Sequence, residues 1–208
     1  ARAMAAPELA NVLAFDGADR GVQAHRDARL RPQALLPVGR GAQGRAAQLR
    51  GHGLARFCAG DLVGIVPPGS AVPRYYSLAS SRGDGFLEIC VRQMPHGLCS
   101  THLMGLQPGD HIAAFVRSNP GFVLPRTRRP VLLIGAGTGV APLAGFIRNN
   151  DRRVPMHLYF GGRDPARDFY FGPEIGQWLA DGRLTRARTV FSRLPEGGGY
   201  VQDALQCD

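Results

Sequence analysis

Several patterns that would assign a function quickly are missing from this sequence. No apolar run approaches the roughly 20 residues that a membrane-spanning helix needs, and the N-terminus has no signal-peptide core. The four cysteines include no CxxC pair, and the six histidines show no HExxH or other close ligand spacing. These absences argue against a disulfide framework and a metal site, and they favour reduced thiols in the cytoplasm.

Acidic residues are also scarce relative to basic ones, 16 against 25, so the formal net charge is +9. The basic residues are arginines, and their densest groupings are isolated doublets such as Arg128-Arg129 and Arg152-Arg153. A basic protein of this kind suits nucleic acid, an anionic membrane surface, or an anionic cofactor with an acidic protein partner. Charge alone leaves these three classes open.

Turn residues are abundant, with 28 glycines and 16 prolines in 208 residues. Residues 1–30 show no clear pattern. Beyond them, short apolar runs between turn signals predict strands at 61–66, 74–79, 86–91 and 111–116. A short helix is predicted to begin at Ser100 or Thr101 and to end before Pro108. Closely spaced strands with Gly/Pro turns are typical of an antiparallel β-barrel or sandwich.

The pattern changes near residues 126–130. The stretch VLLIGAGTGVAPLAGFIRNN reads as an apolar strand, a glycine turn and a helix with Pro142 in its first turn. Two further apolar strands, MHLYFGGRD and ARTVFSR, flank a helix that ends near Asp181-Gly182. This alternation predicts a doubly wound parallel sheet. The sequence therefore predicts two domains, an antiparallel β-barrel over residues 1–125 and a doubly wound α/β domain over residues 126–208.

The glycine turn at 135–139 suits a phosphate-bearing ligand. Glycines allow close approach of the backbone, and a helix N-terminus attracts a pyrophosphate. The alternative is a tight turn without a ligand. The next two strands end at Arg163 and near Arg193, where NAD-type sites usually carry an acidic residue for the ribose. Arginines can pair with a 2′-phosphate, which favours NADPH; Asp164 is the main objection, and a solvated arginine pair is the alternative.

The stretch PRYYSLASS is unusually polar and aromatic for a strand. Alternation puts Arg74 and Tyr76 on one face, where the arginine can hold a phosphate and the ring can lie against a flat heterocycle. Downstream, GLCST offers hydroxyls and N–H groups at a helix start. Together they suit a flavin with a pyrophosphate, namely FAD; an exposed polar strand is the alternative.

Six motifs in order, RYYSLASS, GLCSTHL, LLIGAGTGVAPLAGFI, LYFGGRD…DFYF, FSR and GYVQDAL, resemble the ferredoxin–NADP reductase superfamily. The similarity is greatest to its diflavin-type branch, which includes the sulfite reductase flavoprotein, the reductase region of nitric oxide synthase and the NADPH–cytochrome reductases. It runs from about Asp61 to Val201. It implies a flavoprotein oxidoreductase that passes a hydride from NADPH to FAD and electrons to a separate acceptor.

The resemblance implies a role for each matching residue. Ser77 would lie near flavin N5 and be catalytic, Arg74 would hold the FAD phosphate and Tyr76 would pack on the isoalloxazine. The other implied cofactor-binding residues are Cys90 and Arg92 at the flavin edge, Gly97, Leu98, Cys99 and Ser100 at the FAD pyrophosphate, Gly137 and Thr138 at the NADP pyrophosphate, and Ser192, Arg193, Tyr200 and Gln202 around the 2′-phosphate and adenine, with Arg163 as a further candidate.

The sequence departs from the family pattern in two places. Many relatives carry a lysine two residues before the tyrosine that corresponds to Tyr200, and this chain has Gly198, so we expect Arg193 to carry more of the phosphate charge and NADPH selectivity to be reduced. The strand with a Cys-Gly motif and the terminal aromatic that relatives carry are absent before Asp208, so the α/β domain is expected to be incomplete.

The resemblance also implies partners and rivals. The acceptor would be an acidic flavodoxin-like or haem protein or domain, in the cytoplasm or at the cytoplasmic face of a membrane, with no transmembrane segment in this chain and no nucleic acid. One alternative is an FAD-binding fragment or electron-transfer module that does not turn over NADPH. A weaker one is a nucleic-acid or membrane-surface protein that uses the +9 charge.

Overall fold

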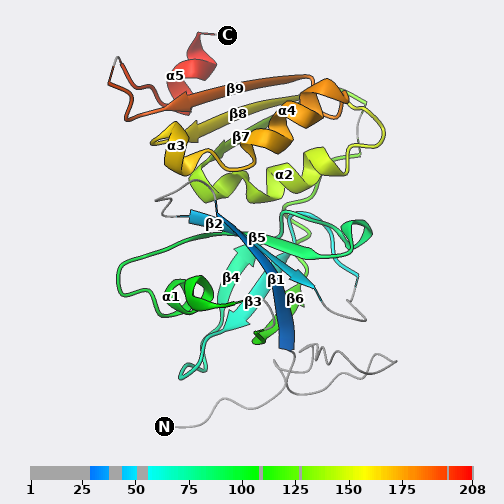
Figure 1. Ribbon diagram of the computed structural model, residues 1–208. Helices are drawn as coiled ribbons and strands as arrows, with labels where there is room; N and C mark the ends of the chain where they lie inside the picture. Colours follow the sequence, from blue (N-terminus) through cyan, green and yellow to red (C-terminus); the bar gives the residue numbers. More distant parts are fainter. Residues whose placement is uncertain are drawn as a thin grey trace.

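The computed structural model describes residues 29–37, 44–50, 56–107, 110–126, 128–195 and 197–207, with backbone only for the first two ranges. Two sheets form two layers of the molecule, one above the other in Figure 1. The lower sheet is antiparallel and the upper one is parallel. The two-domain architecture that the sequence predicts is therefore present. Most of the unpatterned segment 1–30 lies outside the described residues.

The antiparallel sheet has six strands in the order β4-β3-β6-β1-β2-β5. The strands are β1 (Arg29–Pro37), β2 (Gly44–Arg50), β3 (Leu62–Val66), β4 (Arg74–Ser77), β5 (Leu87–Arg92) and β6 (Ile112–Arg117). In this order β4 and β5 are the edge strands, and beyond β4 a single bridge joins Leu78 to Ile89. The predicted antiparallel arrangement is confirmed, whereas closure into a barrel is represented by that bridge alone.

Strands β1 and β2 were not predicted from the sequence. Their residues, RLRPQALLP and GRAAQLR, lack a clean alternation of apolar and polar types, and β1 includes two prolines. They become strands because they pair with each other, and because β2 also pairs with β5 along its length, from Gly44 opposite Arg92 to Leu49 opposite Leu87. Pairing across the sheet thus outweighs weak local propensity.

A short helix, α1 (Leu98–Gly105), follows β5. It begins before Ser100, where the sequence predicted its start. Gly97 occupies the N-cap position and no side chain caps the first turn, so the hydroxyl that signalled a cap lies inside the helix instead. Two single turns, η2 (Arg82–Asp84) and η3 (Gly137–Val140), precede β5 and α2 respectively.

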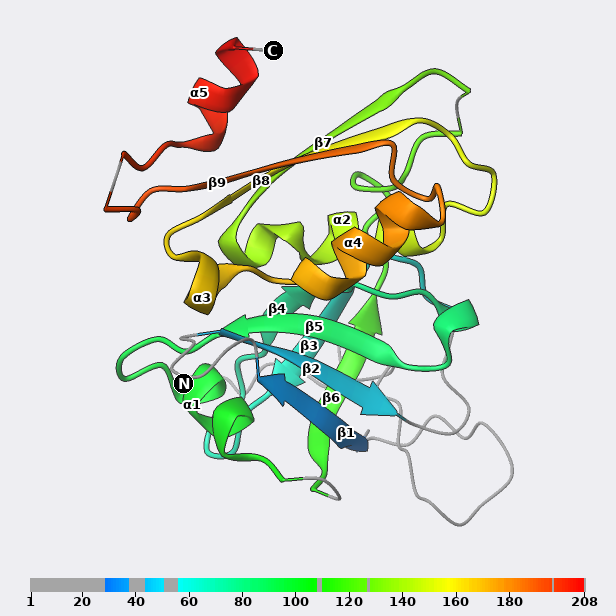
Figure 2. The ribbon, with the colours of Figure 1, turned by 45° about the horizontal axis from the view of Figure 1, so that its top comes forward.

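The parallel sheet has the order β7-β8-β9, from β7 (Val131–Ala136), β8 (Met156–Gly162) and β9 (Arg186–Phe191). Helices α2 (Ala141–Arg148) and α4 (Gly172–Ala180) cover one face, and α5 (Val201–Gln206) lies on the other (Figure 2). The short helix α3 (Pro165–Asp168) follows β8. Helices on both faces of a parallel sheet are the doubly wound arrangement that the sequence predicts.

One hydrophobic cluster joins the two domains. It contains Leu143, Ala144 and Ile147 of α2 together with Ala59, Ala79 and Cys90 of the antiparallel sheet and its loops. A second cluster, which includes Val63, Leu87 and Leu103, belongs to the antiparallel sheet and α1 alone. Because fully buried aliphatic side chains each contribute about 1.5–3 kcal/mol, the shared cluster holds the domains in a defined relative position.

Candidate cofactor-binding site

Strand β4 and helix α1 bring predicted flavin-binding residues together. The Tyr76 side chain is hydrogen-bonded to the Cys99 side chain, and the charge of Arg74 acts on both groups. Tyr76 is half-buried, whereas Arg74 is exposed, with Nη1 3.4 Å from the carbonyl oxygens of Val72 and Pro73. Two segments more than twenty residues apart therefore present an aromatic ring, a thiol and a cation at one place.

Burial decides the protonation of this group. It raises the pKa of Tyr76 well above its ordinary value, and the hydrogen bond with Cys99 raises it further. Burial also raises the pKa of the Cys99 thiol, against the lowering effect of Arg74. Tyrosine and thiol are both neutral at physiological pH, so Arg74 is the charged member of this group.

The N-terminus of α1 adds backbone donors beside these side chains. Gly97 leaves no room for a side chain, because a Cβ there would lie 2.6 Å from Ser100 Oγ. Ser100 Oγ is held within the turn, where it accepts from Met94 N at 3.1 Å and donates to the Gly97 carbonyl at 3.2 Å. Without a side-chain cap, the first-turn N–H groups can meet an anion.

A hollow of about 440 Å³ adjoins this helix start and is lined by Pro68, His96, Gly97, Leu98, Thr101 and His102. Two of the predicted contacts, Gly97 and Leu98, form part of its wall. Leu98 is 53% exposed, so an apolar side chain faces solvent at the start of the helix. The hollow and the exposed leucine together offer an apolar surface at the start of α1.

The other predicted flavin contacts lie elsewhere on the same sheet. Ser77 ends β4, is partly buried and pairs in register with Leu62. Cys90 lies in the cluster shared by the two domains, where burial raises the pKa of its thiol well above the usual range. Arg92 ends β5 with an exposed side chain. Ser77 directly follows Tyr76 in β4, and the Leu78–Ile89 bridge brings the end of this strand beside β5, which carries Cys90 and Arg92.

The predicted nucleotide contacts gather where the parallel strands end. Gly137, with a positive φ of 52°, and Thr138 follow β7. The ends of β8 and β9 are joined by hydrogen bonds from Ser192 N to the Gly162 carbonyl at 3.0 Å and from Arg193 N to the Arg163 carbonyl at 2.8 Å. Ligands of doubly wound sheets bind at this carboxyl edge.

The chain returns to the same edge before α5. Gly199 N donates to the Phe191 carbonyl at 3.1 Å, and a Cβ on Gly198 would lie 2.3 Å from the carbonyl oxygen of Ser192. A side chain at position 198 is therefore incompatible with this loop. Tyr200 is 60% exposed beside it, and Gln202 is exposed on the first turn of α5.

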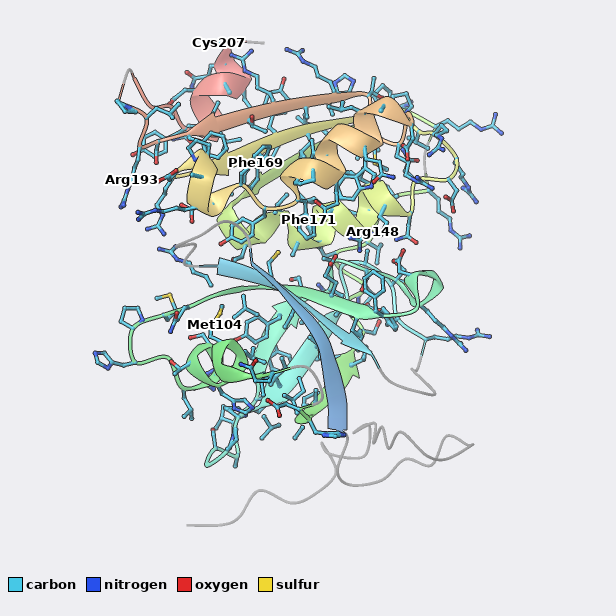
Figure 3. The ribbon with its side chains drawn as sticks, viewed as in Figure 1. Met104, Arg148, Phe169, Phe171, Arg193 and Cys207 are labelled. Atoms are coloured by element: carbon cyan, nitrogen blue, oxygen red, sulfur yellow. The ribbon has the colours of Figure 1, made fainter. Side chains whose placement is uncertain are left out.

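The two arginines of this edge differ in their partners. Arg163 Nε lies 3.3 Å from Asp168 Oδ2, an ion pair with a largely buried carboxylate. Arg193 is exposed, and its side chain makes no ion pair or hydrogen bond with the described residues; it projects from the rim of the upper domain in Figure 3. Asp164, the objection to a 2′-phosphate, caps α3 by accepting from Ala166 N at 2.8 Å.

Sequence reasoning missed Tyr170, which lies between the predicted flavin-binding residues and the predicted nucleotide-binding residues. Burial, followed by the charges of Cys90 and Asp168, raises its pKa to about 12, and Arg92 and Arg163 act in the opposite direction. Tyr170 is therefore close to residues of both domains. The available signal is the run of three aromatic residues in DFYF, a motif of the resemblance that assigns Tyr170 no role.

Arg148 and Glu88 were also missed. Arg148 Nη2 lies 2.7 Å from Glu88 Oε2, across the two domains, and the Glu88 side chain is 1% exposed. An isolated glutamate in the apolar strand LEICVR was the available signal, because a buried carboxylate needs a partner.

The residues fit phosphate-bearing cofactors better than a metal. Each half of the molecule pairs an exposed arginine with a backbone turn, at Arg74 with the start of α1 and at Arg193 with the glycine turn edge. Within the described ranges, no group of three metal-ligating side chains comes together. Nor does any described helix have the length and apolar character that crossing a membrane requires.

Comparison with known families agrees with this division of the chain. Residues 55–115 match the model of the oxidoreductase FAD-binding domain, and residues 133–208 match that of the oxidoreductase NAD-binding domain. The chain therefore carries the two cofactor-binding domains of an oxidoreductase. This is the pair of domains that the resemblance to the ferredoxin–NADP reductase superfamily implied.

Individual relatives cover only the shared region. NADPH oxidoreductase A of Dictyostelium discoideum is 36% identical over 64% of this chain and 24% of its own length. Inducible nitric oxide synthase of Canis lupus familiaris is 37% identical over 73% of this chain and 15% of its own length. The chain thus spans about a quarter or less of these proteins.

Solved structures give the same fold. A cytochrome P450 reductase from Amycolatopsis superposes with a TM-score of 0.73 at 29% identity, over 88% of this chain and 59% of its own. The ferredoxin–NADP+ reductase from Plasmodium falciparum superposes with a TM-score of 0.74 at 19% identity, over 88% of this chain and 78% of its own. At that lower identity the second likeness concerns the fold alone.

Proposed function

We propose that this protein is an NADPH-dependent flavoprotein oxidoreductase that takes a hydride from NADPH onto FAD and passes electrons to a separate acceptor. The observation that carries the proposal is the meeting of Arg74, Tyr76 and Cys99 beside the uncapped start of α1. It occurs on a chain that matches FAD- and NAD-binding oxidoreductase domains.

The FAD site uses charge for the phosphates and packing for the ring. Arg74 and the backbone of Gly97–Ser100 hold the phosphates, because a cation and helix-start N–H groups both favour negative charge. Tyr76 packs on the isoalloxazine, with Cys90 and Arg92 along its polar edge and Ser77 donating near flavin N5. Closure of the antiparallel sheet into a barrel, for which the Leu78–Ile89 bridge is the support, completes this domain over residues 1–125.

The nucleotide site occupies the carboxyl edge of the parallel sheet, in a domain over residues 126–208. Gly137 and Thr138 receive the pyrophosphate at the start of η3 and α2. Arg193 is the main partner of the 2′-phosphate, because Arg163 is engaged with Asp168. Ser192, Tyr200 and Gln202 complete the surroundings. With glycine required at position 198, NADPH preference rests on few charges and is reduced.

The bound cofactors supply the chemistry, a hydride passing from nicotinamide C4 to flavin N5. The protein orients the two rings and excludes water, which brings the reacting atoms into line without a search in solution. The net charge of +9 steers an acidic flavodoxin-like or haem partner toward the reduced flavin in the cytoplasm.

The test is an absorption spectrum of the purified protein followed by anaerobic titration with NADPH and NADH. The proposal predicts a flavin spectrum, release of FAD on denaturation, and bleaching by NADPH at lower concentration than by NADH. A yellow protein that NADPH does not bleach would support an FAD-binding fragment instead. A colourless protein that takes up no FAD would overturn the proposal.

A further inference from the structure

We propose that Arg148 is a positioning residue that sets the distance between the nucleotide edge and the flavin domain, an inference that rests on the proposed function. Arg148 ends α2 and lies at the contact between the two domains in Figure 3. It belongs to neither predicted cofactor set. Its role would be exerted through the elements that it joins rather than by touching a cofactor.

The Arg148 guanidinium makes two hydrogen bonds to the other domain. Nη1 donates to the Ala79 carbonyl oxygen at 2.9 Å, and Nη2 donates to Glu88 Oε2 at 2.7 Å. Its Cζ lies 5.5 Å from the ring centroid of Phe86 and 6.0 Å from that of Trp178. Phe86 belongs to the antiparallel domain and Trp178 to α4, so the cation is held between rings of both domains.

At its other end, α2 continues directly from the glycine turn. Gly137–Val140 forms η3, and α2 begins at Ala141, so the proposed pyrophosphate contacts and Arg148 are opposite ends of one short segment. Eight helical residues span about 12 Å. Because a helix of two turns is stiff, a shift at Arg148 displaces the glycine turn as well.

On the flavin side, the partners of Arg148 lie next to predicted flavin residues. Ala79 is two residues beyond Ser77, and Glu88 is two residues before Cys90. Ala79 N donates to the Glu88 carbonyl at 2.8 Å, which ties the two partners to each other. Arg148 is therefore hydrogen-bonded to the two segments that carry the predicted flavin contacts Ser77 and Cys90.

The surrounding contact leaves little room for adjustment. A Cβ on Gly145 would lie 2.5 Å from Ala59 Cβ and 2.8 Å from the Ala79 carbonyl carbon, so the α2 backbone rests on the flavin domain. The Phe122 and Phe146 rings pack 5.6 Å apart nearby. Because α2 is in direct contact with the flavin domain, the two hydrogen bonds of the Arg148 guanidinium fix the orientation of the C-terminal end of α2 and its distance from that domain.

The geometry calls for arginine in particular. Two separate N–H groups reach two acceptors while the planar guanidinium lies beside two rings, which the single ammonium of lysine cannot reproduce. Arg148→Lys keeps the charge opposite the buried Glu88 but loses the fork, and Arg148→Gln loses both. Arg152→Gln is the matched control, because Arg152 is exposed four residues further on and makes no ion pair with the described residues.

The experiment is anaerobic stopped-flow reduction of the FAD-loaded protein by NADPH, with the limiting reduction rate separated from the nucleotide dissociation constant. For Arg148→Gln we expect the limiting rate to fall on the order of 10- to 100-fold while the dissociation constant changes by less than about threefold, since small displacements of reacting groups slow transfer strongly. Arg148→Lys should fall in between, and Arg152→Gln should match the unmodified protein.

An unchanged limiting rate in folded, FAD-loaded Arg148→Gln would overturn the proposal, and this includes the case in which only the nucleotide dissociation constant rises. If Arg148→Gln fails to fold, Arg148→Lys decides by the same criterion. If the unmodified protein is not reduced by NADPH, the proposed function fails. Hydrogen exchange then tests the contact separately, with faster exchange in Arg148→Gln expected at both 79–88 and 141–149, and unchanged exchange contradicting it.

Discussion

The flavin-side and nucleotide-side residues are held in different ways. Tyr76 is partly buried and Cys99 is buried; the two side chains are hydrogen-bonded to each other and belong to a strand and a helix that share one core. Arg193, Tyr200 and Gln202 are exposed and follow the ends of a strand and a loop. Packing therefore fixes the flavin-side side chains before a ligand binds, whereas the nucleotide-side side chains depend on contacts with the ligand for their positions.

This difference has a consequence for substitutions. Changes on the flavin side should affect chemistry and cofactor retention strongly, because a preorganised group loses a defined interaction. Changes on the nucleotide side should affect mainly selectivity, because exposed charges contribute little until a phosphate engages them.

The largest effect is expected for Ser77→Ala. If Ser77 donates near flavin N5, losing that donor should slow flavin reduction by roughly 100- to 1000-fold while FAD content stays the same. Stopped-flow reduction of FAD-loaded protein measures it. Ser70→Ala is the control, since the Ser70 hydroxyl bonds with the backbone of Val72 in an exposed turn. A rate equal to that of the control would remove Ser77 from the mechanism.

Arg74→Gln should weaken FAD binding by about 10- to 150-fold, the value of one charge-assisted hydrogen bond of about 1.5–3 kcal/mol. Fluorescence titration of the FAD-free protein with FAD gives the dissociation constant. Arg82→Gln, at an exposed arginine of η2, should bind FAD as the unmodified protein does. Equal losses in the two variants would point to general charge rather than a phosphate contact.

Arg193→Gln and Arg163→Gln test which of the two arginines at the nucleotide edge binds the 2′-phosphate. Arg193→Gln should lower kcat/KM for NADPH by about 10-fold and leave the value for NADH nearly unchanged, because it removes a free cation from the 2′-phosphate. Arg163→Gln should instead lower the thermal midpoint, because Asp168, largely buried, loses its partner. The reverse pattern would assign the 2′-phosphate to Arg163.

The smallest effect concerns pH. The pKa values of Tyr76, Cys90 and Cys99 are raised in the folded protein mainly by burial, so the folded state holds these protons more tightly than the unfolded chain. Their contribution to stability is complete below the unfolded thiol pKa of about 8.5 and is lost as pH rises above it. The denaturant concentration at the unfolding midpoint should therefore decrease as the pH rises from 8 to about 10. Cys90→Ala should flatten this decline, and a midpoint independent of pH would contradict it.

The sequence predicted what local patterns encode. The alternation of RYYS, the apolar run of VLLIGA and the glycine turn after it were enough for two domains and for most strands. It missed β1 and β2, because their strand structure depends on pairing with β5 and β6. It also missed Arg148 and Tyr170, because their partners lie 60 residues or more away in the sequence or in the other domain.

The reason for glycine at position 198 could not be predicted from the sequence either. In the sequence, GGG is typical of an ordinary loop, at a position where many relatives carry a lysine. In the structure, the Ser192 backbone occupies the space that a side chain at position 198 would need. Such close approaches between loops have no local signature, and they decide how many cations this edge can offer.

The most direct test of the account is a crystal structure of the protein with FAD and NADP+ bound. The account predicts the FAD phosphates against Arg74 and the start of α1, the isoalloxazine on Tyr76 near Ser77, and the NADP+ pyrophosphate at Gly137 and Thr138. A flavin bound away from both β4 and α1, or a nucleotide away from the carboxyl edge of the parallel sheet, would contradict it.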